Sequence, residues 1–186
     1  ILLTDDRNRF LTQTGPGTPT GNLFRRYWIP ALLSEEVAEK GCPPVRVTLL
    51  SEKLVAFRDS NGEIGLIEEF CSHRRVSLWF GRNEDCGLRC PYHGWKYDVQ
   101  GNCVDIPSEP EDSVIRQEAG LQAYPLIKVG DVLWTYMGDP ANTPPEPEWE
   151  FATVAPEQTV TTKRLQESNW LQALEGGIDS SHVSWL

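Results

Sequence analysis

Short apolar runs, each about the length of a β-strand, dominate the hydrophobic pattern of this chain. Residues 45–50 and 54–58 are mostly β-branched or apolar, and the turn residues 59–62 lead into a third run at 64–67. Runs of this length, bounded by turn residues, are typical of antiparallel hairpins. The three segments therefore predict a β-meander.

Further pairs of apolar segments follow the meander. Residues 78–81 pair with 87–89, residues 96–99 with 102–106, and residues 121–128 with 132–137, each across a short polar stretch. With the meander, these hairpins predict a small all-β unit over residues 40–138.

Helical patterns are confined to the two ends of the chain. Near the start, Leu3, Phe10 and Leu11 have helical spacing and predict a short helix within residues 4–14, followed by a loop at 16–21. Near the end, residues 158–165 alternate apolar and polar and predict a strand. Ser168 then predicts the N-cap of a helix that begins at Asn169.

The pattern divides the chain into four parts. Residues 139–150 contain four prolines, Pro140, Pro144, Pro145 and Pro147, and predict a stiff linker. We expect a lead-in segment at 1–39, an all-β domain at 40–138, this linker, and the beginning of an α+β domain at 151–186. Because the second domain breaks off early, we expect the chain to be the N-terminal portion of a longer polypeptide.

The overall charge limits the possible partners. The chain has 17 basic and 27 acidic residues, a formal net charge of −10 and a pI near 4.8. Such a chain would repel nucleic-acid phosphates, so we expect no nucleic-acid partner. No run approaches the ~18 apolar residues of a membrane-spanning helix, so we expect no membrane partner.

The chemistry of the chain is concentrated between residues 71 and 95. Cys71 and His73 form a C-x-H segment, and Cys90 and His93 form a C-x-x-H segment. If the two loops face one another, they offer two thiolates and two imidazoles to one site. Thiolates suit sulfide-bridged iron, and neutral imidazoles on a second iron raise its reduction potential. This donor set predicts a Rieske [2Fe-2S] cluster, with Gly94 permitting a tight backbone turn and Trp95 covering the cluster.

Structural zinc is the alternative for the same four donors. Tetrahedral zinc accepts two Cys and two His, but zinc fingers usually pair Cys with Cys and His with His. The mixed pairs favour the cluster. The three remaining thiols, Cys42, Cys86 and Cys103, are an odd number in a chain without a signal-like segment. We therefore expect reduced cysteines and a cytoplasmic location.

The paired motif resembles the cluster-binding motif of Rieske proteins. Neither loop carries the extra Cys of high-potential respiratory Rieske proteins, so the chain resembles the low-potential oxygenase and ferredoxin types. It departs from the common oxygenase loop C-P-H-R-G at Ser72 and Arg75, which leaves the donor atoms unchanged and affects only the loop conformation. Residues 15–19, 80–84, 105–110 and 176–182 resemble the phthalate dioxygenase branch.

A second resemblance lies near the end of the chain. The predicted last helix would place Glu175, Asp179 and His182 on one face. Residues 179–182 resemble the first half of the D-x2-H-x4-H segment of Rieske oxygenase α subunits. The resemblance implies that His182 binds a mononuclear Fe(II), that a second His follows at position 187, and that Asp179 bridges His182 to a cluster His of a neighbouring subunit.

The family resemblance implies a terminal oxygenase. Such a subunit receives electrons from an NAD(P)H-dependent flavin and iron-sulfur reductase, passes them through the cluster to Fe(II), and activates O2 to dihydroxylate, hydroxylate or demethylate an aromatic acid. In the family's geometry, the two metal sites of one subunit lie too far apart for fast electron transfer. The resemblance therefore also implies a trimer or stacked trimers. The alternative function is a Rieske ferredoxin, an electron carrier without catalytic iron; the residues after 139 argue against it.

Overall fold

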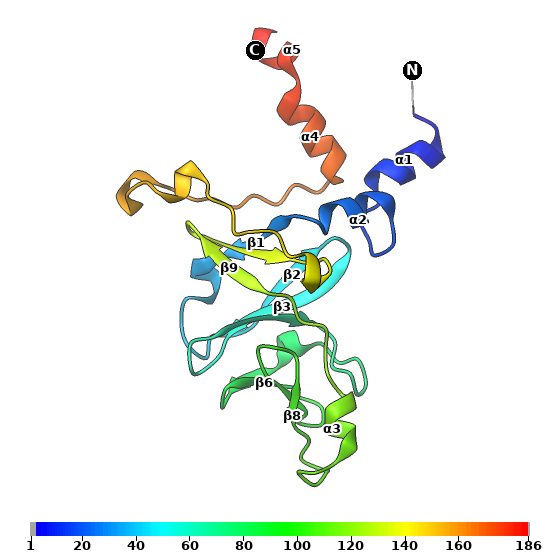
Figure 1. Ribbon diagram of the computed structural model, residues 1–186, viewed down its shortest axis with the longest axis vertical. Helices are drawn as coiled ribbons and strands as arrows, with labels where there is room; N and C mark the ends of the chain where they lie inside the picture. The colour runs from blue at the N-terminus through cyan, green and yellow to red at the C-terminus, as the bar shows by residue number, and fades with distance from the viewer. Residues whose placement is uncertain (1–2, 186) are drawn as a thin grey trace.

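A computed structural model describes residues 3–185 as a body of three small antiparallel sheets, with helices near both ends of the chain (Figure 1). The strand orders are β1-β10-β9, β2-β3-β4 and β5-β6-β7-β8. The strands are β1 (Trp28–Leu33), β2 (Val45–Leu49), β3 (Glu52–Arg58), β4 (Ile64–Glu68), β5 (Arg82–Glu84), β6 (Gly87–Arg89), β7 (Lys96–Tyr97), β8 (Cys103–Asp105), β9 (Leu126–Val129) and β10 (Val132–Tyr136). The α-helices are α1 (Asp5–Thr12), α2 (Pro19–Phe24), α3 (Val114–Glu118), α4 (Trp170–Ile178) and α5 (Ser180–Trp185).

The expectation of an all-β domain made of small antiparallel sheets is confirmed. The meander is formed by β2, β3 and β4, with Val55 of β3 opposite Ile67 of β4. The hairpins β7–β8 and β9–β10 also form where the sequence places them. These hairpins form as predicted because the alternation of apolar and polar residues and the turn residues favour the same local structure.

Strand β3 separates two hydrophobic cores. Its Val55 and Phe57 side chains enter one core, which contains the two motif cysteines, Cys71 and Cys90, and which we call the cysteine core. The alternate residues of β3, such as Leu54, enter a second core against β1, β2 and β10. Because successive strand residues point to opposite faces, a continuous apolar run is needed to fill both. Truncating the fully buried Phe57 to Ala is expected to cost ~3–5 kcal/mol.

One local prediction in the β domain was wrong, and one strand before that domain was missed. Residues 78–81 were expected to be the first arm of a hairpin, but Leu78–Phe80 is a 3-10 turn and the arm is β5. Strand β1 was not predicted; it lies in the expected lead-in segment and pairs with β10 across a bulge near Pro30. A proline inside an apolar run argues against a strand, and pairing with a distant strand overrides that local signal.

Near the N-terminus, α1 confirms the predicted helix, whereas the predicted loop at 16–21 was wrong in its second half. The helix α2 begins at Pro19, the favoured first helical residue, with the Thr18 hydroxyl accepting from the N–H of Gly21 as its N-cap.

The C-terminal predictions need three corrections. Residues 158–165 form no strand: within the described chain this segment pairs with none of the three sheets, and an unpaired extended segment is not stable as a strand. The N-cap of α4 is Asn169 rather than Ser168, since the Asn169 side chain accepts from the N–H of Gln172. The helix also ends at Ile178, because Asp179 has an extended ψ of 95°. Asp179 and His182 therefore do not share one continuous helix face with Glu175.

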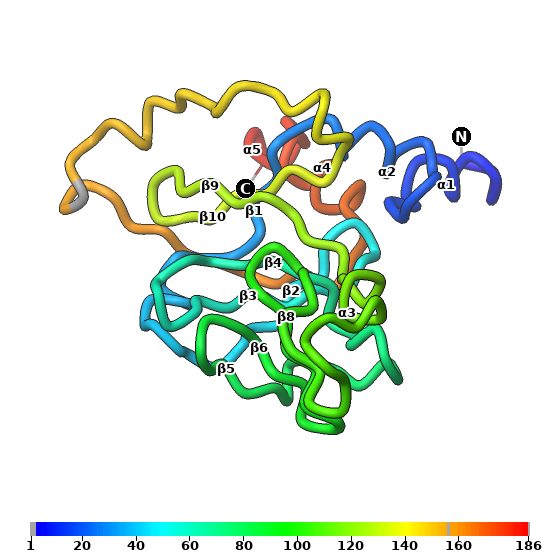
Figure 2. Tube along the Cα trace, turned by 60° about the horizontal axis from the view of Figure 1, so that its bottom comes forward, coloured from blue at the N-terminus to red at the C-terminus, as the bar shows by residue number. Residues whose placement is uncertain are grey.

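The segment after β10 lies along the outside of the β1-β10-β9 sheet (Figure 2). The indole N–H of Trp28 donates to the carbonyls of Pro144 and Pro145 at 3.2 Å each, and the Trp149 ring packs 4.2 Å from that of Trp134. Beyond the linker, the Trp170 indole donates to the Leu11 carbonyl at 3.0 Å and joins α4 to the N-terminal helix. No helix within residues 3–185 is long and apolar enough to cross a membrane.

Candidate metal centre

Two loops at the cysteine core carry the predicted cluster ligands. The first cluster loop, residues 71–76, follows β4 and is closed by an antiparallel bridge between Phe70 and Ser77. The second cluster loop, residues 90–95, joins β6 to β7. Both loops are thus held at each end by paired strand residues, which fixes where their side chains start.

The two loops share one backbone hydrogen-bond pattern. The N–H of Cys71 donates to the carbonyl five residues later at 3.0 Å, and the N–H of Cys90 does the same at 2.8 Å. In return, the N–H of Arg75 donates to the Cys71 carbonyl at 2.9 Å, and that of Gly94 to the Cys90 carbonyl at 3.1 Å. Arg75 and Gly94 both have positive φ, at 57° and 76°. The departure from Gly at position 75 therefore leaves the loop conformation intact.

The two loops place their sulfur donors in the core and their nitrogen donors at the surface. The thiols of Cys71 and Cys90 are neighbours in the cysteine core and are 1% and 3% exposed. The rings of His73 and His93 lie at the surface with centroids 4.6 Å apart. A Rieske cluster needs this arrangement, because one iron takes both thiolates and the other takes both imidazoles. The Trp95 ring stacks on His73 at 4.7 Å and an angle of 7°, so it covers one imidazole.

The same arrangement does not suit a single zinc ion. Tetrahedral zinc would need all four donors around one point. Two separate pairs instead fit two bridged irons with two protein ligands each.

The protonation states of the ligands are set by their surroundings. Desolvation, the nearby His93 and the nearby Arg74 lower the pKa of His73, so its imidazole is neutral and able to bind metal at neutral pH. Burial raises the pKa of the Cys90 thiol, and binding to a cationic iron would require this thiol to lose its proton.

The sequence analysis missed a hydroxyl network behind Cys71. The Tyr97 hydroxyl lies 3.2 Å from Sγ of Cys71 and 2.9 Å from Oγ of Ser72, and it accepts from the Ser72 N–H at 3.2 Å. The Ser72 hydroxyl donates to the carbonyl of Ala119 at 2.7 Å. Burial raises the pKa of Tyr97 far above its usual value, so its hydroxyl remains a donor. The sequence did offer one signal for Tyr97. It lies two residues after Trp95, which was expected to cover the cluster, and residues at that spacing in an extended segment lie on the same side of the chain.

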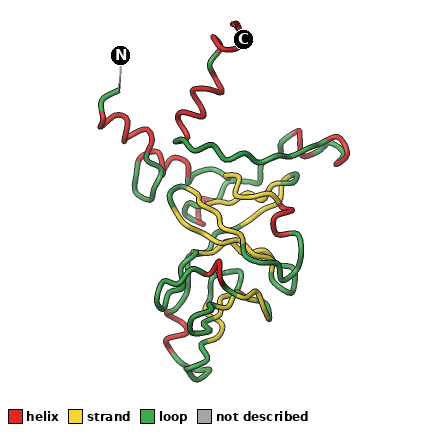
Figure 3. The backbone as a smooth tube through the Cα atoms, turned by 180° about the vertical axis from the view of Figure 1, so that it is seen from behind, coloured by secondary structure: helices red, strands yellow, loops and turns green. Residues whose placement is uncertain are grey.

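The predicted second site lies elsewhere in the molecule. Asp179 Oδ2 is 2.6 Å from Nδ1 of His182, and both side chains are exposed. The hydrogen bond from His182 lowers the pKa of Asp179. Helices α4 and α5 project from the end of the molecule opposite to the β5-β6-β7-β8 sheet (Figures 1 and 3). One chain therefore does not bring Asp179 or His182 to the cluster loops.

Comparison with known proteins agrees with the geometry of the loops. The family model described as Rieske [2Fe-2S] domain matches residues 27–125. The chain belongs to this Rieske family. Its resident cofactor is thus a [2Fe-2S] cluster rather than zinc, as the mixed Cys and His pairs predicted.

The Rieske chain is also similar to curated oxygenase subunits. It is 48% identical over 187 residues to the 3-chlorobenzoate-3,4-dioxygenase oxygenase subunit of Comamonas testosteroni, covering 100% of this chain and 43% of that protein. It is 45% identical over 191 residues to the phthalate 4,5-dioxygenase oxygenase subunit of Pseudomonas putida, covering 100% and 42%. The chain therefore spans less than half the length of these relatives. The resemblance to the phthalate dioxygenase branch is confirmed.

A solved structure gives the same answer for the fold. Dicamba monooxygenase bound to dicamba superimposes with a TM-score of 0.61 at 27% identity, covering 70% of this chain and 40% of that one. The relatives named here are oxygenases rather than electron carriers. The alternative of a Rieske ferredoxin is therefore not favoured.

Proposed function

We propose that this chain is the Rieske-bearing N-terminal part of a terminal oxygenase subunit. The observation that carries the proposal is the sorting of donors in the two loops, with a buried thiol pair and a surface imidazole pair. When bound, the cluster supplies a one-electron carrier whose potential depends on its ligands and hydrogen bonds. We also propose the domain division expected from the sequence: a lead-in segment at 1–39, the all-β Rieske domain at 40–138, a linker at 139–150 and the beginning of the catalytic domain at 151–186. Residues 1–2 and 186 lie outside the described structure.

The imidazole pair is placed to exchange electrons with another protein surface. Beside His73 and His93 lies a hollow of about 650 Å³, whose lining includes Trp95, Pro107 and Ile115. An apolar hollow next to the surface ligands would exclude water when a partner covers it. This supports docking of an NAD(P)H-dependent flavin and iron-sulfur reductase or of a neighbouring subunit at this face.

Asp179 and His182 would contribute to a mononuclear Fe(II) site. The hydrogen bond at Nδ1 leaves Nε2 of His182 free to bind metal, and the Asp179 carboxylate orients the ring. The remaining ligands, including a His at position 187 and a distant carboxylate, would follow the present chain. The iron would activate O2 toward the organic substrate.

Assembly and substrate follow from the same proposal. The separation of Asp179 from the cluster loops within one chain supports a ring-like homo-oligomer, such as a trimer or stacked trimers, in which Asp179 meets a cluster His of its neighbour.

An aromatic carboxylate is the proposed substrate, supported by two relatives whose names state 3-chlorobenzoate and phthalate. The three thiols outside the cluster loops, Cys42, Cys86 and Cys103, are free cysteines, which supports a cytoplasmic location.

The ligand assignment is tested by removing donors from the full-length subunit. We expect His73→Ala and Cys90→Ser to abolish the visible absorption of the cluster and its EPR signal after dithionite reduction. Cys86→Ser is the matched control, because Cys86 is a half-buried thiol outside the loops. His182→Ala should keep the cluster spectrum and lose only the mononuclear iron. A colourless, zinc-loaded wild-type protein would refute the assignment.

A further inference from the structure

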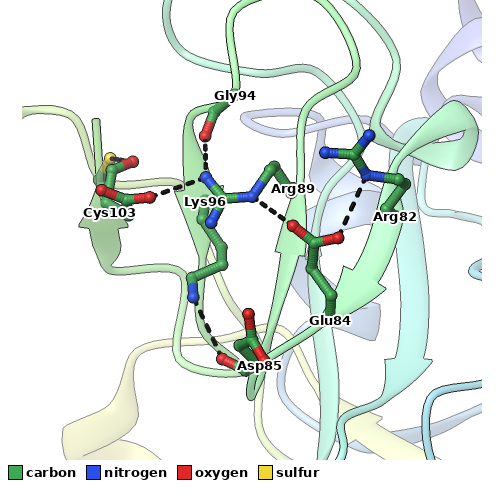
Figure 4. Close-up of polar contacts among 8 residues, drawn as sticks. Arg82, Glu84, Asp85, Arg89, Gly94, Lys96 and Cys103 are labelled. Atoms are coloured by element: carbon green, nitrogen blue, oxygen red, sulfur yellow. Dashed lines mark hydrogen bonds and ion pairs between the residues drawn. The ribbon is translucent and has the colours of Figure 1, made fainter. Parts of the chain in front are cut away.

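The Arg89 side chain connects the second cluster loop to the surrounding sheet (Figure 4). It precedes Cys90 directly and is 14% exposed. Its Nη1 donates to the Gly94 carbonyl at 2.6 Å and to Asp105 Oδ2 at 2.8 Å, and its Nε donates to Glu84 Oε1 at 2.5 Å. One guanidinium thus joins strands β5, β6 and β8 to the loop that contains two predicted ligands.

The contact with Gly94 matters because it fixes a peptide inside the loop. Gly94 follows His93 directly, and its N–H already donates to the Cys90 carbonyl. When Arg89 also holds its carbonyl, both polar groups of this residue have fixed partners. The backbone between Cys90 and Gly94 then has little conformational freedom, so the His93 side chain is attached at a fixed backbone position.

The charges around Arg89 make the contact strong. Burial alone would lower the pKa of Arg89, but hydrogen bonds to the Asp105 and Glu84 carboxylates raise it above its usual value. The same hydrogen bond from Arg89 lowers the pKa of Glu84. Arginine is always protonated in proteins, and its charge-assisted hydrogen bonds to Glu84 at 2.5 Å and Asp105 at 2.8 Å are of a kind that is shorter and stronger than neutral ones. A lysine carries the same charge but lacks the planar fork that reaches several acceptors at once.

We propose that Arg89 is a positioning residue for the cluster: its guanidinium locks the Gly94 peptide, and thereby fixes the orientation of the His93 ligand and slows loss of the cluster. The inference rests on the proposed ligand role of Cys90 and His93. It goes further by assigning their geometry to a side chain that binds no iron. Replacing such supporting groups typically weakens metal binding about 10-fold to 100-fold.

The test compares two arginines that share one carboxylate. Arg89→Met removes every contact of the guanidinium, whereas Arg82→Met removes only the contact with Glu84 at 3.2 Å from a side chain that is 70% exposed. Both variants are made in the full-length subunit with its cluster. The readouts are the EPR spectrum of the reduced cluster and the rate at which a chelator bleaches its visible absorption.

We expect Arg89→Met to change the EPR g-values and to lose the cluster about 10-fold to 100-fold faster than wild type. Arg82→Met should keep the spectrum and change the rate by less than ~2-fold, as for an exposed ion pair. A merely structural role would lower the thermal midpoint without altering the spectrum of the intact fraction.

The outcomes separate this inference from the proposed function. If Arg89→Met keeps the wild-type spectrum and bleaching rate, the inference is overturned while the ligand assignment stands. If Arg89→Met does not fold, Arg89→Lys decides: wild-type spectrum and rate in that variant also overturn the inference, and an altered spectrum supports it. If the wild-type protein holds no cluster, the proposed function fails instead.

Discussion

The two cluster loops reach the same backbone shape with different side chains. Each closes a Cys N–H onto a carbonyl five residues later, and each has its fifth residue in the left-handed region. The first loop uses Arg75 there and is supported by the Tyr97 and Ser72 hydroxyls. The second uses Gly94 and is supported by the guanidinium of Arg89. A ligand loop is thus defined by its hydrogen bonds, and different side chains can satisfy them.

The difference at the fifth position has a steric reason. Arg75 is 60% exposed, and its guanidinium pairs with Glu68 and lies over the Phe70 ring, so its side chain has room and partners. A left-handed conformation costs a non-glycine residue ~1–2 kcal/mol, which these contacts can offset. At Gly94, an added Cβ would lie 2.9 Å from Cγ of Pro107. Only the second loop therefore requires glycine.

Among changes in the two cluster loops and the residues that support them, Gly94→Ala is expected to have the largest effect. The new Cβ would meet both the left-handed penalty and the rigid Pro107 ring, so we expect a loss of ~2–4 kcal/mol of stability and most of the cluster. Iron per chain and visible absorption measure the effect. Gly176→Ala is the control, since a Cβ there has no neighbour within 4 Å. Full cluster occupancy in Gly94→Ala would contradict the steric argument.

Tyr97→Phe is expected to have the next largest effect. It removes the hydroxyl beside Cys71 Sγ and leaves the Ser72 N–H without that partner, which should cost ~1–3 kcal/mol in unfolding free energy. Because hydrogen bonds to ligand sulfur stabilise the reduced cluster, its reduction potential should fall. An EPR-monitored redox titration measures the potential. Tyr136→Phe, which loses a hydroxyl bonded to the Asn142 carbonyl, should leave the potential unchanged.

Ser72→Ala should shift the potential in the opposite direction. The Ser72 hydroxyl donates to the Ala119 carbonyl, so it can only accept from Tyr97 and competes with Cys71 for that proton. Without it, the Tyr97 hydroxyl donates to sulfur alone and the potential should rise, while stability falls by ~1 kcal/mol. The same titration serves here. A fall in potential in both variants would show that the two hydroxyls do not compete.

Arg75→Gly is expected to have the smallest effect. Glycine relieves the positive φ of 57°, but the exposed ion pair with Glu68 is lost and the unfolded chain gains entropy. These changes nearly cancel, so the unfolding free energy should change by less than ~1 kcal/mol and the cluster should remain. Thermal unfolding and visible absorption measure both quantities. Loss of the cluster would mean that Arg75 holds the first loop in a way that its contacts do not explain.

The sequence by itself determined the family, the meander and the later hairpins, and it predicted the donor set on which the proposed function rests. Two Cys and two His at mixed spacing specify the chemistry, because ligand type selects the metal. Short alternating runs with turn residues specify local strand pairs, because both signals act within a few residues. The resemblance also linked Asp179 to His182, and the two side chains lie 2.6 Å apart, although not on the continuous helix face that was expected.

Only the tertiary structure decided the remainder. The pairing of β1 and the support from Arg89 and Tyr97 depend on contacts between separate parts of the chain. The placement of the thiols in the core and of the imidazoles at the surface depends on the face of the loop from which each side chain projects. The break of the last helix at Asp179 likewise follows from a backbone angle that no residue pattern specified. Local patterns fix which residues are available, and long-range packing fixes where their atoms meet.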